Sequence, residues 1–75
     1  MKDWLDITVN PPEMEKGKTN TADDNYLCKN DTGGQLIGMI HRSEYAYPHT
    51  YNCYNHRGEC IRNVKMYRVY NGKLI

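Results

Sequence analysis

Three side chains that can bind a metal or form a disulfide fall within eight residues, at Cys53, His56 and Cys60. Their spacing is Cys-x2-His-x3-Cys, and a fourth donor such as Cys28 would complete a tetrahedral zinc site. A structural zinc would suit a chain of 75 residues, because so short a chain builds only a small core. The spacing contains no Cys-x2-Cys or His-x3-His pair, however. We therefore expect no bound metal, with zinc at these four residues as the alternative.

Turn chemistry is expected to separate the two nearby sulfurs. The segment NHRG (residues 55–58) fits a type I turn followed by a glycine with positive φ. That register pairs Tyr54 with Cys60 and Cys53 with Ile61, so the two thiols point to opposite faces and cannot be bonded. A two-residue loop would place the cysteines opposite each other, but it needs positive φ at both of its central residues. We therefore expect free thiols in a reducing cytoplasm.

Strand patterns dominate the second two thirds of the chain. Residues 25–30, 35–42, 51–54 and 59–70 have the composition of strands, and the last of these is expected to bend near Asn63. Gly38 weakens its strand or lets another backbone approach closely. Asn71-Gly72 predicts a final hairpin. The expected fold is mainly β, a small antiparallel meander of four to five strands.

The chain is short enough to form one domain, residues 1–75. Residues 10–25 are polar and contain Pro11 and Pro12, so we expect an exposed loop there. A short helical turn at residues 12–16 would make the fold α+β, since proline is tolerated at the first helical position. No run approaches the ~20 apolar residues that span a bilayer. The sequence therefore predicts a cytoplasmic protein without a membrane partner.

Tyrosine is over-represented: there are seven tyrosines, one tryptophan and no phenylalanine. So many tyrosines exceed what a core of this size should hold, and tyrosine is enriched at protein interfaces. We expect a partner-binding patch at Tyr45, Tyr47, Tyr51 and Tyr54. Exposed sheet edges would also allow a homodimer.

Charge is unevenly distributed along the chain, although the net charge is only +1. Residues 1–31 carry seven acidic residues against four lysines, and residues 56–75 carry five basic residues against one acidic residue. Basic grooves with stacking aromatic rings hold single-stranded nucleic acid. The last strand offers such an alternative site at Arg62, Lys65, Tyr67, Arg68 and Tyr70. Dedicated nucleic-acid-binding proteins usually carry more positive charge, so a protein partner is favoured.

Catalytic chemistry is not indicated by the spacing of the reactive residues. His41, His49 and His56 are possible bases, and Glu44 or Asp31 a possible acid. No pattern brings a nucleophile, a base and an orienting group together, and there is no phosphate-binding loop. We therefore expect neither an enzyme nor a cofactor.

Several short motifs resemble those of a family of small phage and prophage proteins of unknown function. Its members begin with a Trp-[Ile/Leu]-x-[Ile/Val] segment, have a proline eight positions after the tryptophan, and end on a V-T-H-W-like strand. The similar pieces here are Trp4-Leu5-Asp6-Ile7 with Pro12, then Tyr26-Leu27-Cys28, and finally Val64-Lys65-Met66-Tyr67. The resemblance implies a phage-encoded accessory protein in the bacterial host cytoplasm. Such a protein is expected to bind a host protein as an inhibitor or modulator of an enzyme or defence system.

Overall fold

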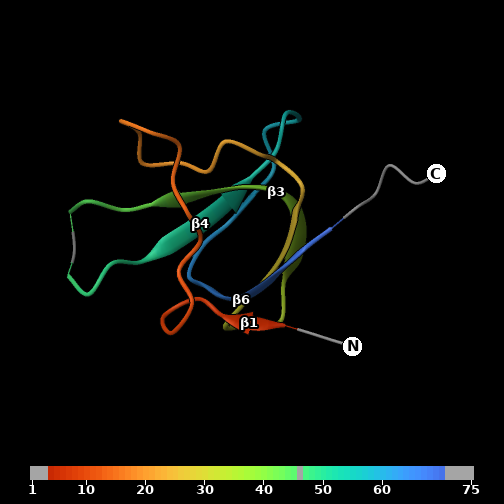
Figure 1. Ribbon diagram of the computed structural model, residues 1–75. Helices are drawn as coiled ribbons and strands as arrows, with labels where there is room; N and C mark the ends of the chain where they lie inside the picture. The colour runs from red at the N-terminus through yellow and green to blue at the C-terminus, as the bar shows by residue number, and fades with distance from the viewer. Residues whose placement is uncertain (1–3, 46, 71–75) are drawn as a thin grey trace.

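The computed structural model describes residues 4–45 and 47–70, and within them the chain forms six β-strands and no helix (Figure 1). The strands are β1 (Leu5–Asp6), β2 (Tyr26–Asn30), β3 (Gln35–Arg42), β4 (Tyr51–Tyr54), β5 (Cys60–Ile61) and β6 (Val64–Val69). They form one sheet in the order β1-β6-β2-β3-β4-β5, with every neighbouring pair antiparallel. The predicted mainly β, antiparallel fold is confirmed. The hairpin expected at Asn71-Gly72 lies outside the described residues.

The path of the chain differs from a simple meander at β6. Strands β2 to β5 follow one another across the sheet, but β6 leaves this order and lies between β1 and β2. The break falls at Asn63, whose φ of 58° bends the run that the sequence presented as one long strand. Because β5 pairs with β4 while β6 pairs with β2, the sheet curves around its own interior. Figure 1 shows β6 passing beneath β3 and β4.

The long strand β3 belongs to both halves of this curved sheet. Its first part, up to Gly38, pairs with β2, and its second part, from Met39, pairs with β4. A Cβ atom at Gly38 would lie 2.7 Å from the carbonyl carbon of Tyr54. The close backbone approach expected at this glycine is therefore present, and it lets β4 cross β3 where β3 changes partner.

The loop at residues 10–25 is exposed over most of its length, but two of its side chains are buried. Thr21 has no exposed surface and Pro12 is also buried. The backbone N–H of Thr21 donates to the Ile40 carbonyl over 2.9 Å. Its hydroxyl accepts from the Ile40 N–H over 3.1 Å and donates to the Asp23 carbonyl over 2.8 Å. The loop is thus attached to the edge of β3, and these two positions are exceptions to the exposure expected for residues 10–25.

The helical turn considered at residues 12–16 does not form. A tight turn follows instead, in which the Lys18 N–H donates to the Glu15 carbonyl over 2.8 Å. Gly17 occupies it with φ 78°, a conformation that glycine adopts readily and that ends any helix. The Glu15 N–H then donates to the Asn20 carbonyl, which directs the chain towards β3.

The core lies inside the curve of the sheet and draws on strands from both halves. Its buried apolar members are Ile7, Cys28, Ile40, Tyr51, Cys53, Val64 and Tyr67. Met14, Tyr26, Leu36 and Ile61 pack against this group. The core is small and includes two cysteines and two tyrosines, which is consistent with the limited interior of a 75-residue chain.

Candidate protein-binding surface

The two most exposed aromatic side chains lie together on the loop between β3 and β4, residues 43–50, which we call the tyrosine loop. Tyr45 and Tyr47 are 101% and 90% exposed, respectively. The loop is closed at its base by a hydrogen bond of 2.8 Å from the Ser43 N–H to the Thr50 carbonyl. In Figure 1 it projects away from the rest of the sheet. The fold therefore presents two large rings to solvent on a protruding loop.

His49 helps to organise this loop. Its Nδ1 lies 3.0 Å from the Ser43 carbonyl, which can only accept, so Nδ1 carries the proton. Its ring meets the Tyr47 ring edge-to-face, with 5.5 Å between centroids. The Tyr45 N–H also donates to the Ser43 hydroxyl over 3.3 Å. These contacts position the base of the loop and one face of Tyr47, and leave Tyr45 without packing.

A recess of about 180 Å³ adjoins the tyrosine loop. It is lined by Thr8, Tyr47, Pro48, His49 and Tyr51. The wall is mostly aromatic, with hydroxyl and imidazole groups as its polar atoms. A recess of this size can receive one side chain of a partner protein. The two protruding tyrosine rings beside it can at the same time insert into the partner's surface.

Two tyrosines predicted for the same patch are not exposed as Tyr45 and Tyr47 are. Tyr51 is only 8% exposed and belongs to the core. Tyr54 is half-buried, with its ring 6.4 Å from that of His41. The alternation within β4 explains the difference, because Tyr51 shares the inward face with Cys53. The two-residue period of a strand already groups Tyr51 with Cys53 on one face of β4. Which face is buried became known only from the structure.

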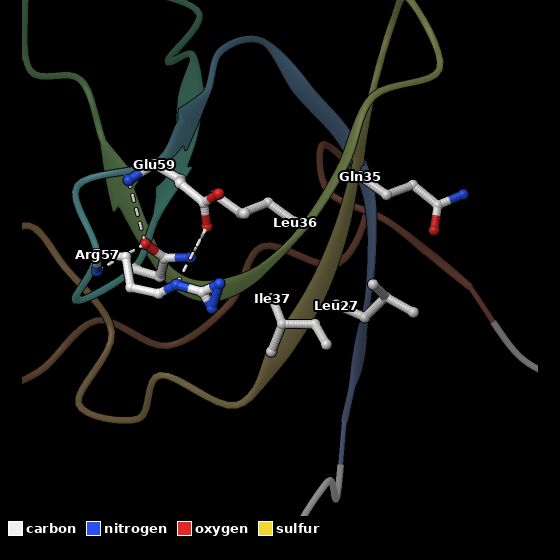
Figure 2. A pocket seen from close by; sticks show the side chains of 7 residues that line it. Leu27, Gln35, Leu36, Ile37, Arg57 and Glu59 are labelled. Atoms are coloured by element: carbon white, nitrogen blue, oxygen red, sulfur yellow. Dashed lines mark hydrogen bonds and ion pairs between the residues drawn. The ribbon is translucent and has the colours of Figure 1, made fainter.

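A second and larger pocket lies at the other end of β4, beside the turn to β5 (Figure 2). It measures about 420 Å³ and is lined by Leu27, Gln35, Leu36, Ile37, Asn55, Arg57 and Glu59. Figure 2 shows Leu27 and Ile37 side by side on neighbouring strands, with the polar turn residues opposite. The pairing of β2 with β3 places these two residues directly across from each other. The sequence analysis did not identify this pocket.

Asn55 holds the polar rim of that pocket in place. Its Oδ1 accepts from the backbone N–H groups of Arg57 and Glu59, over 2.9 Å and 3.1 Å. Its Nδ2 donates to Glu59 Oε1 over 2.8 Å. The Arg57 guanidinium lies 4.0 Å from that same oxygen, and its side chain is 77% exposed. The pocket can therefore offer an apolar wall and a solvated cation to a ligand, with Glu59 next to that cation.

The zinc alternative is not supported by the positions of its four residues. The predicted register is confirmed, with Cys53 opposite Ile61 and Tyr54 opposite Cys60, and Gly58 has φ 83°. Cys53 is consequently buried, while Cys60 is exposed. His56 instead pairs with Asp24, with 2.7 Å between Nε2 and Oδ2. Among residues 4–45 and 47–70, no three His, Cys, Asp or Glu side chains gather in a way that could hold an ion.

The predicted nucleic-acid site is dispersed by the fold. Tyr67 is buried, and its hydroxyl donates to the Asn10 carbonyl over 2.6 Å, so its ring cannot stack on a base. Burial raises the pKa of this hydroxyl. Lys65 is the residue left unpaired where the register of β6 against β2 shifts, and Arg62 precedes the strand. Arg68, which follows Tyr67, points to the opposite face of the sheet. This interpretation of Tyr67 was therefore wrong.

Comparisons with known proteins were made for both the sequence and the fold. No family model matches the chain, and neither the curated proteins nor the solved structures gave a match. Within the described part of the chain, no helix has the length and apolar character needed to cross a membrane. The phage and prophage assignment therefore stays a prediction from the short motifs alone.

Proposed function

We propose that this chain is a small protein-binding module whose main contact is made by Tyr45 and Tyr47. The exposure of these two rings carries the proposal, because neither ring is buried in the core and so neither is needed to stabilise the fold. Tyrosine is a frequent binding hot spot, since its rigid ring buries a large area and its hydroxyl keeps a polar partner. Two such rings on a closed, protruding loop are suited to insertion into a partner's surface.

The recess beside Tyr47 supports the same proposal. A partner that covers the rings would place one of its own side chains between Thr8 and His49. The sheet edges are less suited to association, because β1 and β5 have only two residues each. Short edge strands offer few unpaired backbone groups. We therefore assign the contact to the tyrosine loop rather than to strand addition.

The more specific proposal concerns the kind of partner. The motifs around Trp4, Pro12 and Val64 resemble those of phage and prophage chains, and this resemblance supports a phage-type accessory protein in a bacterial cytoplasm. A chain of 75 residues acting there would bind a host enzyme or defence protein and inhibit or modulate it. This assignment rests on analogy with such small proteins rather than on a site for catalysis.

The proposal is tested with the double variant Tyr45→Ala/Tyr47→Ala. Because both rings are exposed, its thermal midpoint should stay within about 4 °C of the original. Proteins captured from a bacterial lysate are identified with the original chain, purified, and titrated against both forms by calorimetry. Loss of two hot-spot rings should weaken binding by about thirtyfold or more.

The matched control is Val69→Ala, which removes an exposed apolar side chain from β6. This valine is 67% exposed. The control should bind as the original chain does. Equal affinity of the tyrosine variant and the original chain for every purified partner would contradict the proposal. Light scattering of the free chain would show whether the rings instead hold two copies together.

A further inference from the structure

The outer face of the sheet carries an apolar pair beside an exposed arginine. Leu27 lies directly opposite Arg68 in the ladder between β2 and β6, and opposite Ile37 in the ladder between β2 and β3. Cross-strand partners share a face, so Arg68, Leu27 and Ile37 form one row across three strands. Cys28, the residue after Leu27, is buried in the core, so this row faces away from the core.

Arg57 extends the row at its other end. Figure 2 shows the Arg57 guanidinium on the Ile37 side of the apolar pair, away from Leu27. All three residues line the same pocket of about 420 Å³. Lys29 adds a third cation, because it follows Leu27 by two positions and shares its face, with its Nζ 4.6 Å from the centroid of the Trp4 ring. The apolar pair is thus flanked by cations from β2, β6 and the turn between β4 and β5.

Two carboxylates lie at the borders of this face, and neutral groups hold both. Glu59 Oε1 accepts from Asn55 Nδ2 over 2.8 Å, and its contact with Arg57 is longer, at 4.0 Å. On β1, Asp6 Oδ1 accepts from the backbone N–H and the hydroxyl of Thr8, over 2.9 Å and 2.7 Å. The three cations outnumber these two carboxylates, so the face suits an anionic partner.

We propose that this face binds an acidic segment of a partner protein, with an aliphatic side chain on the apolar pair and carboxylates at Arg57 and Arg68. Neighbouring strands lie about 5 Å apart, so the row from Arg68 to Ile37 spans about 10 Å before Arg57 extends it. Positions i, i+2 and i+4 of an extended peptide point to one side and span about 13 Å. Acidic, aliphatic and acidic residues at those positions therefore match the row.

The exposure of the site favours a protein segment over other ligands. Ile37 is 38% exposed and the Arg57 side chain 77%, so a small molecule would keep much of its surface in water, whereas small-molecule sites bury most of their ligand. Nucleic acid would match the arginines but not the aliphatic pair, because bases stack on aromatic rings. The site lies at the other end of β4 from the tyrosine loop, and its binding does not depend on the contact proposed there.

The probe for this site is a blocked peptide with glutamate, serine, leucine, serine and glutamate in that order. It is titrated into the isotope-labelled full chain and followed by nuclear magnetic resonance. The amide signals of Leu27, Ile37 and Arg57 should shift and saturate. Replacing both glutamates of the peptide with glutamine should weaken binding about tenfold or more, because each loses a charge-assisted hydrogen bond.

Variants of the chain assign this binding to the two arginines. Arg57→Gln/Arg68→Gln should weaken binding of the acidic peptide about as much as removing the peptide's charges does. The matched control is Lys16→Gln/Lys18→Gln, which removes two charges from the loop at residues 10–25 and should change the affinity by less than about twofold, since distant exposed charges are screened by salt.

Glu59→Gln distinguishes binding from a structural effect. Glutamine keeps an oxygen for Asn55 Nδ2 but removes the negative charge beside Arg57. This variant should bind the acidic peptide several times more tightly, a gain that damage to the fold would not produce. Tyr45→Ala/Tyr47→Ala should bind the peptide as the original chain does, so failure of this proposal and failure of the tyrosine contact are distinguishable.

Equal affinity for the acidic and the glutamine peptides would overturn the proposal, as would shifts that do not saturate at millimolar peptide. Tighter binding of a single-stranded oligonucleotide at the same residues would overturn it in favour of nucleic acid. Shifts at these residues that grow with chain concentration in the absence of peptide would overturn it in favour of a second copy of this chain.

Discussion

Gly38→Ala is the substitution that most directly tests how the two halves of the sheet meet. β3 changes partner from β2 to β4 immediately after this glycine. A methyl group there would meet the carbonyl oxygen of Tyr54 and lie 2.7 Å from its carbonyl carbon. Both are backbone atoms of β4, so neither can rotate out of the way. The two strands must separate, or the hydrogen bonds between them must lengthen.

The size of the effect follows from two opposing terms. Overpacking a closely packed interior typically costs about 1–3 kcal/mol, and contact with backbone places this site near the upper end. Alanine also restricts the unfolded chain, which returns about 0.5–1 kcal/mol. We expect a net loss of about 2 kcal/mol, against a total stability of roughly 4–11 kcal/mol for a chain of this length. The thermal midpoint should then fall by about 8–16 °C.

Urea denaturation followed by circular dichroism measures this loss, and Gly34→Ala is the matched control. A methyl group at Gly34 would lie 3.2 Å from the side-chain oxygen of Asn30, which can move slightly. The control should therefore lose less than about 1 kcal/mol. If Gly38→Ala unfolded at the same urea concentration as the original chain or the control, the close crossing of β3 and β4 would be wrong.

Three further predictions concern buried polar groups. Thr21→Val keeps the shape of the side chain but leaves the Ile40 N–H without its hydroxyl acceptor. Its free energy of unfolding, measured by urea denaturation, should therefore fall by about 1–3 kcal/mol. Thr21→Ser keeps the hydroxyl and should lose less. Tyr67→Phe removes the hydrogen bond to the Asn10 carbonyl and should lose about 0.5–1.5 kcal/mol, with no loss expected if the hydroxyl were solvated. Burial raises the pKa values of Tyr26 and Tyr67 above the ordinary 10.0, so folding favours their neutral forms. Their contribution is complete well below pH 10 and is lost as the pH rises through the folded-state pKa values, so urea midpoints should fall as the pH rises above 10, and a flat profile would contradict this assignment.

Local features were the most predictable from sequence. The turn at residues 55–58 and its register were predicted correctly because asparagine and glycine have strong conformational preferences at those positions. The bend at Asn63 and the close approach at Gly38 were predictable for the same reason. The ranges of β3 and β4 agree with the predicted ranges, since strand composition and flanking turns define them.

Features that depend on distant segments were not predictable in this way. The return of β6 to pair with β2, and the addition of β1 beside it, require a choice among strands of similar composition. The sequence of β6 by itself does not show which strand it will pair with, because every strand offers the same backbone hydrogen-bonding groups. The burial of Thr21 has the same origin, since its partner Ile40 lies on another strand.

Tyrosine shows where the two kinds of information divide. Composition alone indicated that this chain has more tyrosine than a small core holds, so that some of it would lie on the surface. Only the tertiary structure decided that Tyr51 and Tyr67 are buried while Tyr45 and Tyr47 are exposed. The reason is physical: a ring with a polar tip is tolerated in both environments, so its place depends on which face of its strand the curved sheet encloses. The burial of Cys28 and Cys53 in one core was decided in the same way, by the curvature of the sheet rather than by spacing along the chain.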